Sequence, residues 1–182
     1  MKKKHIIEFL LLFILGGLTS LSLPPFNFFI INFFTFSIFF GFLFQSLNRT
    51  GKNIFFFYGW FFGFGYFLTN LYWITISLTF DENLNFLIPI ALILIPCLLA
   101  SFYGLATFCF YLFNPKNILS AFFGFSVLLG ITEFLRGTIL TGFPWNLIVY
   151  SFSKNLSLIS ILSFIGTYSL NLIVVSFFSA PT

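Results

Sequence analysis

Long apolar stretches, separated by short polar links, dominate the pattern of this sequence. A helix that crosses a membrane needs about 20 predominantly apolar residues, and six stretches approach or exceed that length. They cover residues 6–23, 28–47, 54–80, 84–113, 118–140 and 156–178. The pattern therefore predicts an all-α integral membrane protein, built as a polytopic bundle of about six transmembrane helices with no soluble domain.

The composition indicates that lipid is the main solvent of the chain. Only 7% of its residues are charged and 59% are hydrophobic, whereas an ordinary soluble domain is roughly 25% charged. The 34 Phe residues occur in apolar runs such as 55–57, not interleaved with basic residues as in a nucleic-acid-binding protein. We therefore expect Phe side chains that face lipid, and no nucleic acid among the partners.

Basic residues gather in the links that would lie on one side of the predicted bundle. If the amino terminus is cytoplasmic, the residues on the inner side are Lys2, Lys3, Lys4, Arg49, Lys52 and Lys116. Asp81, Glu82 and Lys154 then lie outside, and the excess of basic residues on the inner side gives a positive-inside bias. A signal peptide in the first 23 residues is the alternative, but Glu8 interrupts its charge pattern and no small-x-small cleavage site clearly precedes Pro24.

The cysteines and the histidine of this chain do not form a pattern typical of a metal site. Cys97 and Cys109 lie twelve residues apart in one apolar run and have no charged neighbour, which fits neither a metal pattern nor a reactive thiol. His5, the single histidine, belongs to the basic amino-terminal tail. We therefore expect neither a metal nor a cofactor.

One ionisable pair, Glu133 and Arg136, lies inside an apolar stretch. Ionisable groups at membrane depth cost about 2.5–3.5 kcal/mol each on insertion scales, so they rarely occur there without a partner or a function. Their spacing of three places both side chains on one helix face. They could neutralise each other and fix helix packing. Alternatively, Arg136 could meet a lipid phosphate while Glu133 orients it or meets an ammonium group.

A Gly-Phe-Pro-Trp turn follows this pair and should end the helix near Thr141, because Gly142 permits a tight bend and Pro144 disfavours helix at Phe143. Trp145 is suited to the membrane interface. Tyr72 and Trp73 could belong to the same aromatic belt or form a wall that faces substrate. The candidate lipid-facing or substrate-facing residues are Glu133, Arg136, Thr141, Gly142, Phe143, Pro144, Trp145, Tyr72 and Trp73.

The stretch T-E-F-L-R-G-T-I-L-T-G-F-P-W at 132–145 resembles the membrane half of the apolipoprotein N-acyltransferase family. Weaker matches are Tyr150-Ser151, the turn at 23–26, and the glycine-rich stretch 59–65 that leads to Tyr72-Trp73. The resemblance implies a multi-pass enzyme of the bacterial inner membrane. Such enzymes move an acyl chain from a phospholipid to the N-terminal diacylglyceryl-cysteine of a lipoprotein, through a Cys thioester.

The family's Glu-Lys-Cys triad belongs to a nitrilase-like domain, and no position of this chain matches it. We therefore expect no catalytic residue here and no activity of the chain alone, with a separate nitrilase-like chain as partner unless the chain is a fragment. A small transporter or a non-catalytic membrane scaffold are the alternatives. Transporters usually carry polar groups on several helices near the midplane, whereas this sequence has one charged pair near one helix end.

Overall fold

The computed structural model describes residues 3–139 and 142–181, and every regular element in this part of the chain is a helix. The elements are α1 (Lys3–Ser20), α2 (Ile31–Ser46), α3 (Lys52–Asn70), η1 (Tyr72–Phe80), η2 (Glu82–Leu87), α4 (Ile88–Phe113), α5 (Ile118–Thr138), η3 (Ile148–Phe152), α6 (Leu156–Ile159), α7 (Leu162–Ile165) and α8 (Thr167–Ser179), where η marks 3-10 helices. The all-α prediction is confirmed for the described residues.

Length and composition single out few of these helices as membrane spans. Within the described residues, η2 with α4 forms a continuous 32-residue helix and α5 has 21 residues, and both are long and apolar enough to cross a membrane. α3 and η1 qualify together as a third span that bends by 47° at their junction. Two to three candidate spans follow, while the six-span topology with a cytoplasmic amino terminus stays a prediction.

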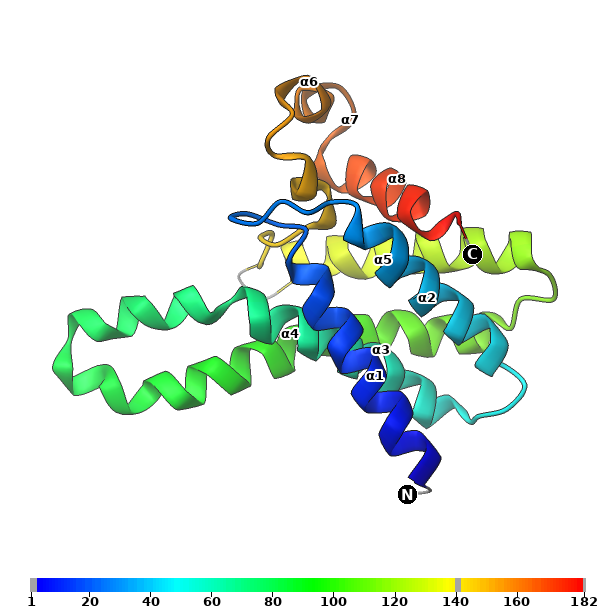
Figure 1. The fold of residues 1–182 in the computed structure, drawn as a ribbon, viewed down its shortest axis with the longest axis horizontal. Coiled ribbons are helices and arrows are strands. Elements are labelled where there is room, and N and C mark those ends of the chain that lie inside the picture. Colours follow the sequence, from blue (N-terminus) through cyan, green and yellow to red (C-terminus); the bar gives the residue numbers. More distant parts are fainter. Residues whose placement is uncertain (1–2, 140–141, 182) are drawn as a thin grey trace.

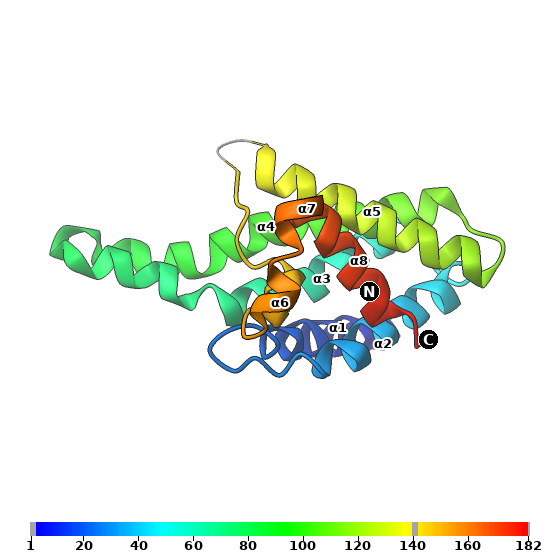
Figure 2. The same cartoon turned by 90° about the horizontal axis from the view of Figure 1, so that it is seen from above.

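α3 lies at the centre of the bundle, between α1 and α4 (Figures 1 and 2). Glycines allow both neighbours to approach closely. A Cβ atom added to Gly16 of α1 would lie 1.9 Å from the carbonyl oxygen of Phe62, and one added to Gly59 of α3 would lie 2.2 Å from that of Tyr103. Small residues permit such close contacts between membrane helices, where packing and not the hydrophobic effect drives association.

Replacement of Gly59 by alanine should destabilise the bundle, because the new Cβ would meet the backbone of α4. Gly51→Ala is the matched control, since a Cβ there has no atom within 4 Å. Overpacking of this kind costs about 1–3 kcal/mol, so the melting temperature of Gly59→Ala in detergent should fall by several degrees while that of Gly51→Ala stays unchanged. Equal melting temperatures would show that α3 and α4 are less tightly packed than described.

Many of the Phe side chains pack inside the bundle, which corrects the expectation that the Phe excess faces lipid. The rings of Phe39 and Phe62 stack at 4.1 Å between centroids, and Phe125 contacts Phe39 edge-on at 5.8 Å. Others, such as Phe34 and Phe123, are exposed. Aromatic rings provide large contact areas with specific geometry, and helices surrounded by lipid depend on such contacts.

η1, η2 and the first half of α4 form a hairpin that extends beyond the rest of the bundle (Figures 1 and 2). None of the residues of η1 or η2 is buried. Asp81 lies between the two 3-10 helices, where its carboxylate accepts a hydrogen bond from the backbone N–H of Asn83 at 3.0 Å. This capping contact makes the turn between η1 and η2.

The two ends of the bundle differ in charge. In both views the α2–α3 link with Arg49, the start of α3 at Lys52 and the α4–α5 link with Lys116 lie at the end opposite to the segment that follows α5 (Figures 1 and 2). The predicted stretch 156–178 is divided into α6, α7 and α8, with Gly166 at φ +80° before α8. This left-handed backbone conformation interrupts the helix at a residue without a side chain.

Candidate functional site

Glu133 and Arg136 form an ion pair in the last two turns of α5. Arg136 Nε donates to Glu133 Oε2 at 3.0 Å, and Arg136 Nη2 donates to the same oxygen. The two residues are only 2% and 1% exposed. The spacing of three residues thus brings the charges together inside the bundle, where burial makes their mutual attraction stronger than in water.

The remaining contacts of Arg136 hold the segment that follows α5. Its Nη1 donates to the carbonyl oxygens of Phe143 at 2.7 Å and Trp145 at 2.9 Å. Its Cζ lies 5.2 Å from the ring centroid of Phe67 and 5.9 Å from that of Phe143, within the range of cation–π attraction. The guanidinium is therefore enclosed by a carboxylate, two carbonyls and two rings, and it fixes the course of residues 143–145.

The backbone after α5 turns sharply at Gly142, which has φ +72°. The N–H of Phe143 reaches back to the carbonyl of Arg136 at 2.8 Å, which folds the turn onto the end of α5. α5 ends at Thr138, earlier than the expected end near Thr141, because Ile139 is already extended at φ −79° and ψ 148°. Thr141 itself lies outside the described residues.

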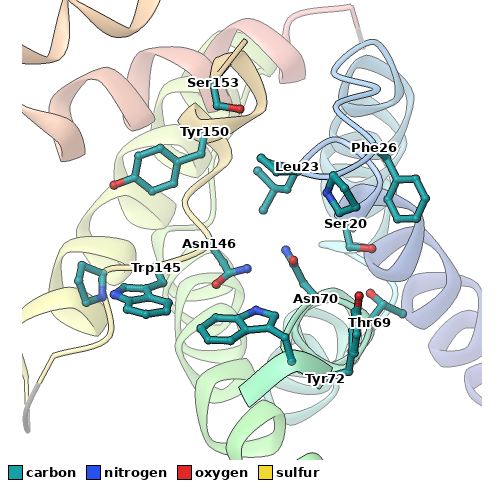
Figure 3. Close-up of a pocket in the computed structure, with 14 residues that line it drawn as sticks. Ser20, Leu23, Phe26, Thr69, Asn70, Tyr72, Trp145, Asn146, Tyr150 and Ser153 are labelled. Atoms are coloured by element: carbon teal, nitrogen blue, oxygen red, sulfur yellow. The ribbon is translucent and has the colours of Figure 1, made fainter. Parts of the chain in front are cut away.

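This turn forms one wall of a pocket with a volume of about 580 Å³ (Figure 3). We call it the tryptophan pocket, because the rings of Trp73 and Trp145 stack in its wall with centroids 5.0 Å apart and planes 14° apart. The lining residues are Ser20, Leu23, Pro24, Pro25, Phe26, Thr69, Asn70, Tyr72, Trp73, Pro144, Trp145, Asn146, Tyr150 and Ser153.

Amide and hydroxyl groups provide the polar part of the tryptophan pocket, and none of its lining residues is charged. The side-chain amides of Asn70 and Asn146 point toward one another (Figure 3). The buried Tyr66 holds Asn146 in place, because its hydroxyl donates to the backbone carbonyl of Asn146 at 2.7 Å. Burial raises the pKa of Tyr150, so its phenol remains a hydrogen-bond donor near neutral pH. The pocket therefore suits a ligand that combines polar and apolar parts.

The structure separates the predicted site residues into two groups. Tyr72, Trp73, Pro144 and Trp145 line the tryptophan pocket. The other described candidates do not line it: Glu133 and Arg136 are buried, and Gly142 and Phe143 form the turn. The charged pair thus supports the pocket wall from within.

Sequence reasoning did not assign the opposite wall to the site. That wall includes Ser20, the turn at 23–26, and the end of α3 at Thr69 and Asn70. The turn at 23–26 contributed only to the family resemblance. Its position in the sequence could have indicated this wall. The turn at 23–26 follows the first apolar stretch, just as the turn at 142–145 follows the fifth.

Among the described residues, no group of three or more His, Cys, Asp or Glu side chains is arranged to hold a metal ion. The titratable side chains that line or support the tryptophan pocket include Glu133 and Arg136 and the phenols of Tyr66, Tyr72 and Tyr150. These groups can donate, accept and position hydrogen bonds.

Comparison with known proteins agrees with the motif. Residues 15–180 match the family model described as the apolipoprotein N-acyltransferase N-terminal domain. The chain is 36% identical over 170 residues to the apolipoprotein N-acyltransferase of Rhodopseudomonas palustris, covering 91% of this chain and 31% of that protein. It is 39% identical over 164 residues to that of Rickettsia typhi, covering 90% and 32%. The chain thus spans about a third of the length of these curated relatives.

Proposed function

We propose, on the premise that this chain belongs to the apolipoprotein N-acyltransferase family, that it acts as the membrane domain of such an enzyme and presents lipid at the tryptophan pocket. The whole enzyme moves an acyl chain from a phospholipid to the N-terminal diacylglyceryl-cysteine of a bacterial lipoprotein. The observation that carries this proposal is the pocket wall formed by Pro144 and Trp145, the last two residues of the stretch 132–145 that resembles the family.

The proposed topology is multi-pass in the bacterial inner membrane, with the amino terminus in the cytoplasm and the tryptophan pocket on the outer side. Two observations support it. The basic links and the segment after α5 lie at opposite ends of the bundle (Figures 1 and 2), and basic residues favour the cytoplasmic side. Trp73 and Trp145 then lie at the outer interface, where indole rings are enriched.

The two groups of site residues have different proposed roles. Tyr72, Trp73 and Trp145 contact the lipid or the lipoprotein terminus, because their side chains line the pocket. Glu133 and Arg136 are positioning residues, because both are buried and the guanidinium bonds to Glu133 and to the carbonyls of Phe143 and Trp145. They keep the pocket wall in place before substrate arrives, which reduces the ordering cost of binding.

The proposed chemistry belongs to a nitrilase-like domain, in which a Cys attacks the phospholipid ester and retains the acyl group as a thioester. A Glu acts as the base and a Lys supports the charged intermediate, as in general covalent catalysis. The 182 residues of this chain offer no match to that triad. Acting alone, the chain therefore binds and presents lipid without turnover.

Complementation tests this proposal in a strain depleted of its own N-acyltransferase. The chain expressed alone should not restore growth, whereas co-expression with a nitrilase-like carboxyl-terminal half should do so. Rescue by the chain alone would contradict the proposed absence of catalysis. The topology can be tested separately with reporter fusions after Trp145, where alkaline phosphatase should be active and a cytoplasmic reporter silent.

A further inference from the structure

The segment between η3 and α8 lies along one end of the bundle. α6 and α7 have four residues each, and the apolar segment Leu156–Ile165 that contains them has ten, about half of what a membrane span needs. In Figure 1, α4 and α5 run across the view, whereas α6 is seen nearly end-on. α6 therefore crosses the direction of the candidate spans, which is the geometry of a helix in the plane of a membrane.

The surface of this segment is suited to the lipid interface. Leu156 is 79% exposed and Phe164 is 85% exposed. The hydroxyl of Ser160 donates to the carbonyl of Ser157 at 2.8 Å, and that of Ser163 donates to the carbonyl of Ser160 at 2.7 Å. Because these hydroxyls are bonded within the segment, they do not require water, and the segment can present its apolar side chains to lipid.

A second pocket, with a volume of about 330 Å³, lies between this segment, η3 and α8. We call it the apolar pocket, because every residue that lines it is apolar. These residues are Val149, Phe152, Leu158, Ile159, Ile161, Leu170, Ile173, Val174 and Phe177. Its volume is in the range of small-molecule sites, of roughly 300–1,000 Å³. Since no polar side chain lines it, the part of a ligand that enters it must be hydrocarbon.

The apolar pocket is distinct from the tryptophan pocket. A 3-10 helix has three residues per turn, so residues three apart share a face. Val149 and Phe152 of η3 line the apolar pocket, whereas Tyr150 and the following Ser153 line the tryptophan pocket. η3 therefore separates the two pockets, and each can be altered without the other.

A cation lies in the link between two walls of the apolar pocket. Lys154 is exposed and comes between Phe152 of η3 and Leu158 of the in-plane segment, both of which line the pocket. A lysine at a membrane surface attracts the phosphate of a lipid headgroup. A hydrocarbon space whose walls are joined by a link with an exposed cation matches the chemistry of a phospholipid, with its apolar chain and anionic phosphate.

We infer that the apolar pocket holds one acyl chain of a phospholipid from the adjacent leaflet, with Lys154 beside its phosphate. The site fixes the in-plane segment to the membrane and to α8. It does not depend on acyl transfer, so it can stand if the proposed function fails. Only the assignment to the outer leaflet rests on the proposed topology.

Native mass spectrometry of the purified, delipidated chain tests this site, with dioleoyl phosphatidylglycerol as the probe. Ile159→Trp fills the pocket from the in-plane segment and Ile173→Trp fills it from α8. Each methylene kept out of an apolar site weakens binding about fourfold, so excluding several should lower lipid retention at least tenfold. Ile131→Trp, on an exposed position of α5, is the matched control and should retain lipid like the wild type.

Lys154→Gln tests the headgroup part of the inference. This variant should weaken retention of dioleoyl phosphatidylglycerol but not that of dioleoylglycerol, which has the same chains and no phosphate. Thermal melting identifies the folded variants, and either pocket-filling variant is sufficient if the other fails to fold. Unchanged retention in a folded pocket-filling variant would overturn the acyl-chain site, as would an equal loss in Ile131→Trp. Unchanged phosphatidylglycerol retention in Lys154→Gln would overturn the placement of the phosphate.

Discussion

Arg136→Met should lower the free energy of unfolding by about 3–5 kcal/mol, which is the cost of removing one partner from a buried ion pair. The variant leaves the Glu133 carboxylate without its cation, and the carbonyls of Phe143 and Trp145 lose their donor. Thermal unfolding in detergent micelles measures this effect. Arg49→Met is the control, because Arg49 lies in the exposed α2–α3 link, and its melting temperature should stay close to that of the wild type.

The double variant Glu133→Leu/Arg136→Met separates the two parts of this cost. It removes both charges, and apolar replacements of a buried ion pair are often neutral or stabilising. The carbonyls of Phe143 and Trp145 nevertheless remain without their donor, so the double variant should melt between Arg136→Met and the wild type. A double variant no more stable than Arg136→Met would show that the bonds to the turn, and not the uncompensated carboxylate, account for the loss.

The same pair can be tested through activity in a full-length version that includes a nitrilase-like domain. Arg136→Ala should lower acyl transfer more than Arg49→Ala, because only Arg136 holds the wall of the tryptophan pocket. If the role is positioning, Arg136→Lys should retain little more activity than Arg136→Ala, because a single ammonium group cannot replace the donors of a guanidinium fork. Equal activity of the two alanine variants would limit the pair to helix packing.

Gly142→Ala should be the second most damaging change, and Gly166→Ala provides its matched comparison. Both glycines have positive φ, at +72° and +80°, so alanine is strained at either position by about 1–2 kcal/mol. Only at Gly142 would the new Cβ also meet backbone, 2.4 Å from the carbonyl oxygen of Gly137, whereas at Gly166 nothing lies within 4 Å. Gly142→Ala should therefore lower the melting temperature more than Gly166→Ala.

Tryptophan fluorescence distinguishes the two glycine variants further. Because Gly142 precedes the residues that form a wall of the tryptophan pocket, its variant should also alter the fluorescence of Trp145. Gly166→Ala should leave this signal unchanged. Similar losses of stability and similar spectra in both variants would indicate that the turn after α5 can relax around an added methyl group.

The sequence predicts the helical class, the family and the shared face of Glu133 and Arg136, because each depends on local spacing or on a contiguous motif. The family prediction is confirmed by the match over residues 15–180. The position of Trp145 beside Trp73 is different, because it depends on how two distant segments pack. Pattern alone indicated an interface residue at each position but could not bring them together.

The sequence also could not predict which groups the buried side chains contact. The charge of Arg136 suggested a lipid phosphate as one partner, yet its nearest acceptors are the carbonyls of the following turn. Helix period fixes which residues share a face, but the backbone conformation after Gly142 decides which carbonyls that face meets. The number of buried Phe rings was underestimated for a related reason, since an all-apolar helix has no polar face to mark its outer side.

The stack of Trp73 on Trp145 mechanically couples the protruding hairpin to the turn that Arg136 holds. Because both indoles line the tryptophan pocket, a displacement of the hairpin at Trp73 would change the shape of that pocket.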